Sequence, residues 1–83
     1  MTERVALITG GAKGIGRGIA LDLATEHWKI AICYRASVAE AEQTSREITE
    51  RGGQALAIRC DVSHPVAAKN LIAQVEQQWG HID

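Results

Sequence analysis

The sequence contains no phenylalanine, one proline, one tyrosine and only two cysteines among its 83 residues. Cys33 and Cys60 lie far apart and have no cluster of cysteine or histidine around them. This spacing excludes a disulfide-rich scaffold and a zinc-finger type of metal site, so we expect no metal. Two isolated thiols are typical of a reducing compartment, and we expect a cytoplasmic protein with reduced cysteines.

The chain also lacks a strong charge of either sign. Nine Lys and Arg stand against ten Asp and Glu, which gives a net charge of −1 with neutral histidines. A nucleic-acid surface would need a basic excess, and a transmembrane helix would need ~20 consecutive apolar residues. Neither is present, and no signal-peptide core follows the first residues, so we expect neither nucleic acid nor a membrane as a partner. Apolar residues make up 46% of the chain, which is typical of a folded domain or of part of one.

A regular alternation of strand and helix patterns runs along the chain. The continuous apolar run 5–9 is typical of a strand that is buried on both faces of a parallel sheet. Further strands are expected at 29–34 and 55–58, and helices at 14–26, 37–51 and 65–79. This βαβαβα order predicts an α/β fold, namely the first half of a Rossmann-type parallel sheet with flanking helices.

Apolar residues mark the faces that the expected helices should bury. In the first helix, Ile15, Ile19 and Leu23 recur every four residues and are backed by two alanines, which predicts a stripe facing the core. His27 lies beside the expected end of this helix, and a positive φ there would be mildly strained for a non-glycine residue. The apolar face expected for the third helix consists of Leu71, Ile72, Val75 and Trp79.

The segment TGGAKGIG, residues 9–16, lies where the first expected strand turns into the first expected helix. Amides at a helix start are unpaired and carry the positive end of the helix dipole, and glycine lets a pyrophosphate approach them. A Walker A loop is excluded because Gly16 is followed by Arg17 and Gly18, and the spacing GxGxxG fails at Ile19. We interpret the remaining pattern, GxxxGxG, as a turn that binds a dinucleotide phosphate. A purely structural glycine-rich turn is the alternative.

With this TGxxxGIG motif the sequence resembles the short-chain dehydrogenase/reductase family. The segments DVS at 61–63 and WGHID at 79–83 also resemble family elements, and the subgroup most similar is the 3-oxoacyl-carrier-protein reductases. The resemblance implies an NADPH-dependent reductase of a carbonyl or 3-oxoacyl substrate, active in fatty acid biosynthesis and assembled as a dimer or tetramer. Residues 1–83 would then be the N-terminal portion of a single NADP-binding Rossmann domain, ending just before a fourth strand.

The resemblance also implies which residues bind the cofactor. Gly10, Gly14 and Gly16 would line the pyrophosphate turn, Asp61 would accept a hydrogen bond from the adenine amino group, and the Val62 amide would bond a ring nitrogen. An alternative role for Asp61 is to cap the turn into the third helix. The full set expected at the cofactor is Thr9, Gly10, Lys13, Gly14, Ile15, Gly16, Tyr34, Arg35, Asp61 and Val62.

Charge at the end of the second expected strand indicates which dinucleotide is preferred. An NAD site keeps an acidic residue ~20 residues beyond the glycines, where it holds the ribose hydroxyls and repels a 2′-phosphate. Here the strand ends in Tyr34 and Arg35, with no acidic residue before Glu40. Arg35 and Lys13 could both hold a 2′-phosphate, so we expect NADP(H) in preference to NAD(H). The alternative is that both are ordinary solvated surface charges.

Catalytic residues of the family have no counterpart in these 83 residues. The family uses a serine and a Tyr-x-x-x-Lys pair, but the only tyrosine, Tyr34, is followed four positions later by Val38. No residue here is assigned a catalytic role, and a non-catalytic nucleotide-binding module or degenerate fragment is the alternative function. The first strand would also present an open apolar edge in the isolated chain, for which we expect marginal stability and self-association.

Overall fold

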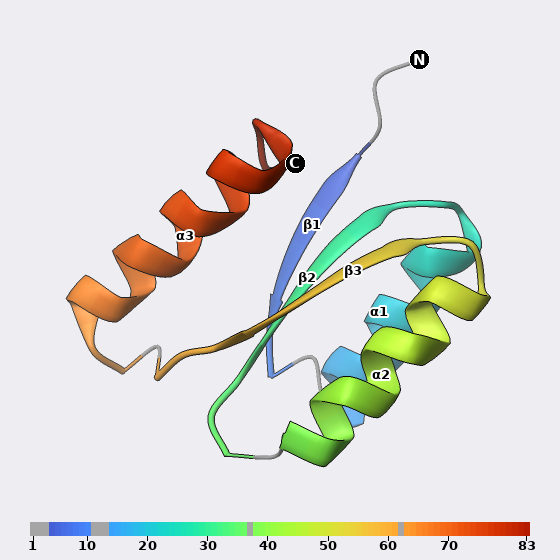
Figure 1. The fold of residues 1–83 in the computed structure, drawn as a ribbon, viewed down its shortest axis with the longest axis horizontal. Coiled ribbons are helices and arrows are strands. Elements are labelled where there is room, and N and C mark those ends of the chain that lie inside the picture. The colour runs from blue at the N-terminus through green and yellow to red at the C-terminus, as the bar shows by residue number, and fades with distance from the viewer. Residues whose placement is uncertain (1–3, 11–13, 37, 62) are drawn as a thin grey trace.

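The computed structural model describes residues 4–10, 14–36, 38–61 and 63–83. Three parallel strands form one sheet in the order β1-β2-β3, and a helix follows each strand in the chain (Figure 1). The elements are β1 (Val5–Thr9), α1 (Gly14–Thr25), β2 (Lys29–Tyr34), α2 (Val38–Glu50), β3 (Gln54–Arg59) and α3 (Pro65–Trp79). The predicted fold class, the first half of a Rossmann-type fold, is therefore confirmed.

The sheet is the middle of three layers. Figure 1 shows α1 and α2 on one face of the sheet and α3 on the other. Successive side chains of the central strand, β2, point to opposite faces of the sheet. Ile30 and Ile32 therefore pack in the cluster beneath α1 and α2, while Ala31 packs with Val75 of α3. This position explains why β2 is apolar almost throughout.

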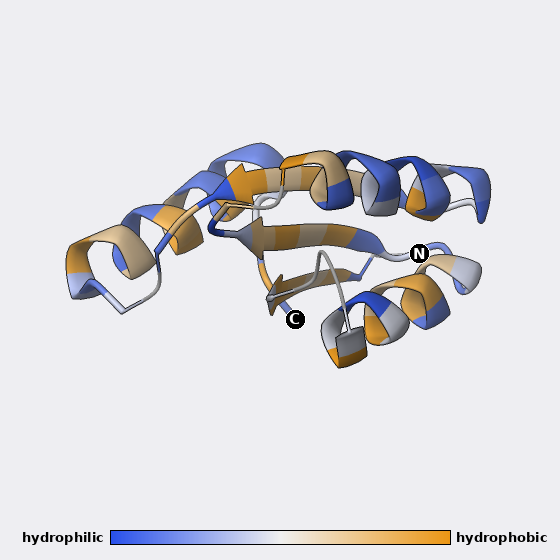
Figure 2. Cartoon of the chain, turned by 90° about the horizontal axis from the view of Figure 1, so that it is seen from below, coloured by the Kyte–Doolittle hydropathy of each residue, from blue (hydrophilic) through white to orange (hydrophobic). Residues whose placement is uncertain are grey.

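Hydropathy follows the same layers. In Figure 2 the strands are largely orange, whereas α2 carries long blue stretches on its outer side. Polar side chains on that helix face water, while Ala41 and Ile48 are buried against the sheet. None of the helices in the described ranges is long and apolar enough to cross a membrane.

The stripe predicted for α1 is wrong in its first two members. The side chain of Ile15 is 85% exposed and that of Ile19 is 48% exposed, whereas Leu23 is partly buried against the core. A spacing of four residues advances about 40° around a helix at each step, so only the last member reaches the core side. The face that α1 buries consists of Ala20, Leu21 and Ala24.

The face predicted for α3 is correct except at Ile72. Leu71 and Val75 are buried and Trp79 packs beside them, but Ile72 is 45% exposed. Residues 71, 75 and 79 share one side of the helix, and residue 72 is turned about 100° away from residue 71.

The segment after α3 returns to β1. The amide of Asp83 donates to the carbonyl of Val5 at 2.8 Å, and the amide of Val5 donates to Oδ2 of Asp83 at 2.8 Å. These two bonds occupy the start of the β1 edge that faces away from β2. A fourth strand beyond them stays a prediction.

His27, two residues after the end of α1, has the positive φ at which mild strain is expected for a non-glycine residue. Its φ is 66°, the only positive φ of a non-glycine residue in the described part of the chain. Nδ1 of His27 lies 3.1 Å from the carbonyl oxygen of Gly52, so a hydrogen bond across the α2–β3 turn offsets part of the strain.

Replacing His27 separates these two contributions. His27→Ala should keep the strained φ and lose the hydrogen bond, whereas His27→Gly removes the strain as well. We expect the glycine variant to unfold at a higher urea concentration, with an advantage of about 1 kcal/mol over the alanine variant. Equal midpoints in urea denaturation, or a more stable alanine variant, would contradict the strain.

Candidate functional site

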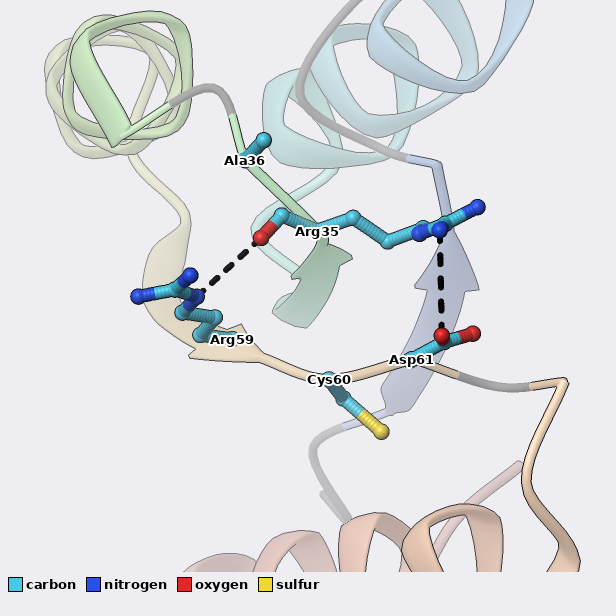
Figure 3. A pocket seen from close by; sticks show the side chains of 5 residues that line it. All are labelled: Arg35, Ala36, Arg59, Cys60 and Asp61. Carbon is cyan, nitrogen blue, oxygen red and sulfur yellow. Dashed lines mark hydrogen bonds and ion pairs between the residues drawn. The ribbon is translucent and has the colours of Figure 1, made fainter.

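A cleft of about 480 Å³ opens at the carboxyl ends of β2 and β3. Figure 3 shows the residues that line it, which come from the two segments that leave these strands. They are Arg35, Ala36, Arg59, Cys60 and Asp61. Ligands of open parallel sheets bind at this end, because the strands all point their carboxyl ends toward the same edge.

The glycine turn lies between β1 and α1 at the same end of the sheet. Gly10 has a φ of 68° and Gly14 a φ of 66°, a region that glycine enters without steric cost. A Cβ added to either residue would meet no atom within 4 Å, so the backbone conformation, not crowding, requires glycine. The amide of Gly10 donates to the carbonyl of Cys33 at 3.0 Å, which ties the turn to the end of β2.

Asp61 is the anionic group of the cleft. Its Oδ1 accepts hydrogen bonds from the hydroxyl of Ser63 at 2.7 Å and from the amide of Ser63 at 3.0 Å. Its Oδ2 lies 3.7 Å from Nη2 of Arg35 and 3.7 Å from Nε2 of His64. The bonds from Ser63, and after them the charges of Arg35 and His64, hold the pKa of this carboxyl below its usual value. Asp61 is therefore ionised at neutral pH.

Both roles considered for Asp61 are compatible with this geometry. The two bonds to Ser63 stabilise the turn that leads into α3, which is the capping role. They use only Oδ1, and the side chain keeps 34% of its surface exposed beside the cleft. The role on an adenine amino group stays a prediction.

Arg35 is the cation nearest to Asp61 in the cleft. It follows β2 directly, its side chain is 75% exposed, and its guanidinium extends across the cleft toward Asp61 (Figure 3). Tyr34, one position earlier, is only half-buried but packs against the core cluster beneath α1 and α2. It does not belong to the residues that line the cleft.

The structure thus places the predicted residues in two groups at one end of the sheet. Arg35 and Asp61 share the cleft. Lys13 and Val62 lie outside the described residues. Around the β1–α1 connection, Thr9 ends β1, Gly10 follows it, and α1 begins with Gly14, Ile15 and Gly16.

Three residues that line the cleft were not predicted from the sequence: Ala36, Arg59 and Cys60. Strand register could have indicated Arg59, because Arg59 pairs with Tyr34 in the parallel β2–β3 ladder and therefore lies beside Arg35. Nε of Arg59 donates to the carbonyl of Arg35 at 3.1 Å. Without the register, no sequence pattern distinguishes an exposed arginine at the end of a strand from an ordinary surface charge.

Both cysteines are free thiols, and Cys60 is one of the residues that line the cleft. Cys33 is buried, and burial, with Cys60 nearby, raises the pKa of its thiol to about 11. Its Sγ donates to the carbonyl of Cys60 at 3.4 Å, and Sγ of Cys60 donates to the carbonyl of Ala67 at 3.4 Å. A buried thiol with a raised pKa is a weak nucleophile at neutral pH, which describes Cys33, whereas Cys60 is only half-buried.

Comparison with known proteins gives the same family from sequence and from structure. The family model described as short chain dehydrogenase matches residues 4–83. A 3-oxoacyl-(acyl-carrier-protein) reductase from Staphylococcus epidermidis is 40% identical over 81 residues, which are 98% of this chain and 33% of the reductase. The chain spans about a third of the length of the curated relatives it matches.

Two solved structures illustrate the likeness of the fold. A variant of a short-chain dehydrogenase/reductase from Serratia marcescens superposes with a TM-score of 0.93 at 34% identity, over 99% of this chain and 34% of the other. A short chain dehydrogenase from Burkholderia cenocepacia, solved in complex with NADP, gives a TM-score of 0.91 at 36% identity. That match covers 100% of this chain and 34% of the Burkholderia protein.

Proposed function

Because this chain belongs to the short-chain dehydrogenase family, we propose that it supplies the NADP(H)-binding part of an oxidoreductase. Residues 1–83 are, in this proposal, the N-terminal portion of a single Rossmann domain, and the whole protein reduces a carbonyl group. The relative at 40% identity favours a 3-oxoacyl substrate. Bound NADPH supplies the hydride, while the residues of this chain bind and orient the dinucleotide. We also propose, from the family resemblance, a cytoplasmic dimer or tetramer that acts in fatty acid biosynthesis.

Two parts of the described structure are compatible with a bound dinucleotide: the glycine turn after β1, and the cleft that contains Arg35 and Asp61. The glycine turn leaves open space beside Gly10 and Gly14, where a pyrophosphate could reach the main chain. Asp61 carries an ionised carboxylate that can accept a hydrogen bond from an adenine amino group.

The observation that carries the choice of cofactor is the position of Arg35. Its guanidinium extends across the cleft at the end of β2, where an NAD-binding protein keeps a carboxylate for the ribose hydroxyls. A guanidinium forms charge-assisted hydrogen bonds with phosphate oxygens, so it favours a dinucleotide that carries a 2′-phosphate. The NADP complex of the Burkholderia relative supports the same choice.

Titration with the two reduced dinucleotides tests this proposal, because NADPH and NADH differ only in that phosphate. The protein should be the longest form that its gene encodes, and binding can be followed by calorimetry. We expect NADPH to bind at least about tenfold more tightly than NADH, equivalent to about 1.4 kcal/mol. Equal affinities, or tighter binding of NADH, would contradict the proposed preference.

A non-catalytic nucleotide-binding module is the second candidate. The observation in its favour is that no Tyr-x-x-x-Lys pair occurs in these 83 residues. Oxidation of NADPH in the presence of a 3-oxoacyl thioester, followed at 340 nm, separates the two candidates. Turnover eliminates the second candidate, whereas tight NADPH binding without turnover of any 3-oxoacyl or ketone substrate supports it.

A further inference from the structure

Arg59 contributes a second guanidinium to the cleft. It is the last residue of β3, and the parallel register places it opposite Tyr34, one position before Arg35. Figure 3 shows Arg59 on one side of the cleft, bonded through Nε to the carbonyl oxygen of Arg35 at 3.1 Å. The guanidinium of Arg35 extends the opposite way, toward Asp61. The two arginines therefore lie on opposite sides of the same cleft.

The charges of the two arginines are compensated differently. Nη2 of Arg35 lies 3.7 Å from the carboxylate of Asp61, which balances part of its charge. No carboxylate of the described residues lies within ion-pair distance of Arg59, whose Nε bonds a neutral carbonyl. With two arginines and one aspartate in its lining, the cleft has a net charge of 2 − 1 = +1. Arg59 is the source of this excess.

The excess charge matches the group that distinguishes NADP(H) from NAD(H). A phosphate monoester carries about −1.5 to −2 charges near pH 7 and offers several acceptor oxygens, whereas NADH has a neutral hydroxyl at that position. One guanidinium that is already shared with Asp61 neutralises such a group incompletely. A second guanidinium can donate further charge-assisted bonds through its Nη groups while Nε stays bonded to the main chain.

We propose that Arg59 is a further specificity-determining residue, which acts with Arg35 to select a dinucleotide carrying a 2′-phosphate. This inference rests on the proposed NADP(H) function. Arg59 acts in two ways: it adds positive charge to the cleft, and it holds the main chain from which the Arg35 side chain extends. The first action distinguishes the two dinucleotides, whereas the second alone would affect both.

Two variants of Arg59, compared with the parent protein, test the inference. Arg59→Met removes the charge and the Nε bond, while Arg59→Lys keeps the charge and loses the planar fork. We expect Arg59→Met to weaken NADPH binding about tenfold, and to weaken NADH binding by no more than about threefold, because NADH is affected only by loss of the Nε bond to the main chain. Arg59→Lys should retain most of the preference. The affinity of Arg59→Met for NADPH should also fall less steeply with added salt, a readout that a purely structural role would not change.

Three outcomes would overturn the inference. The first is an unchanged ratio of NADPH to NADH affinity in Arg59→Met, and the second is an equal loss for both dinucleotides. The third is a salt dependence in Arg59→Met equal to that of the parent. Circular dichroism verifies that the variants are folded, and Arg59→Gln, which keeps a polar side chain, replaces the methionine variant if that one is not. A parent protein without preference for NADPH overturns the proposed function itself, whereas a parent that prefers NADPH while Arg59→Met keeps the full preference overturns only the role of Arg59.

Discussion

Replacing Arg35 by aspartate is expected to reverse the preference of the protein from NADPH to NADH. The change removes the guanidinium at the end of β2 and places a carboxylate there, which would repel a 2′-phosphate and could accept hydrogen bonds from ribose hydroxyls. Lost charge-assisted bonds and new repulsion together should change the ratio of the two affinities by about 100-fold, or about 2.7 kcal/mol. Calorimetric titration of the parent and the variant with both dinucleotides measures this ratio.

The matched control for this experiment is Arg46→Asp. Arg46 is an exposed residue of α2 and does not line the cleft, yet its replacement changes the net charge of the chain by the same amount. We expect this control to leave the affinity ratio within about twofold of the parent, since the Arg46 side chain does not line the cleft and water and salt screen an exposed charge. If Arg35→Asp binds NADPH as tightly as the parent does, Arg35 does not contact the phosphate.

Gly53→Ala is expected to destabilise the protein although it adds only one methyl group. Gly53 is buried where the end of α1, the start of β2 and the start of β3 meet. A Cβ there would lie 2.9 Å from the carbonyl oxygen of Trp28 and 3.1 Å from both Cα and Cβ of Ala24. These neighbours belong to the main chain or are fixed to it, so α1 or β2 would have to move. Such overpacking costs about 1–3 kcal/mol, measurable as a lower midpoint in urea denaturation.

Gly18→Ala is the control for the alanine substitution itself. Gly18 lies within α1, and a Cβ there would meet no atom within 4 Å. Alanine should stabilise an exposed helical position by about 0.5–1 kcal/mol relative to glycine. The two glycine-to-alanine changes are thus expected to shift the midpoint in opposite directions. A Gly53→Ala variant as stable as the parent would show that the α1–β2 junction is not closely packed.

Local patterns in the sequence were sufficient to predict the order of the elements. The apolar run at β1 and the glycines after it required no knowledge of distant contacts, and both lie where they were predicted. Exposure of Ile15 was not predictable in this way, since a helix of small and apolar residues offers several possible faces. α1 packs on the sheet through the face that contains Ala20 and Ala24, because small side chains allow a helix to pack closely against the strands.

The cleft was predictable only in part, for a similar reason. Arg35 and Asp61 follow strands in a recognisable order, so the sequence indicates that both lie at the carboxyl edge of a parallel sheet. The distance of 3.7 Å between Nη2 of Arg35 and Oδ2 of Asp61 depends on the register of β2 and β3 and on the conformations of the two side chains. Neither can be inferred from a local sequence pattern. The bond from Arg59 to the carbonyl of Arg35 depends on the same register.

By itself, then, the sequence determined the α/β class, the glycine turn and the positive charge after β2, because each depends on residues that are neighbours in the chain. Tertiary structure alone decided which face of α1 is buried, that Tyr34 packs against the core, and that Arg59 shares a cleft with Arg35. These features depend on contacts between different helices and strands. Such contacts exist only once the strands are paired, because pairing fixes the distances between their side chains.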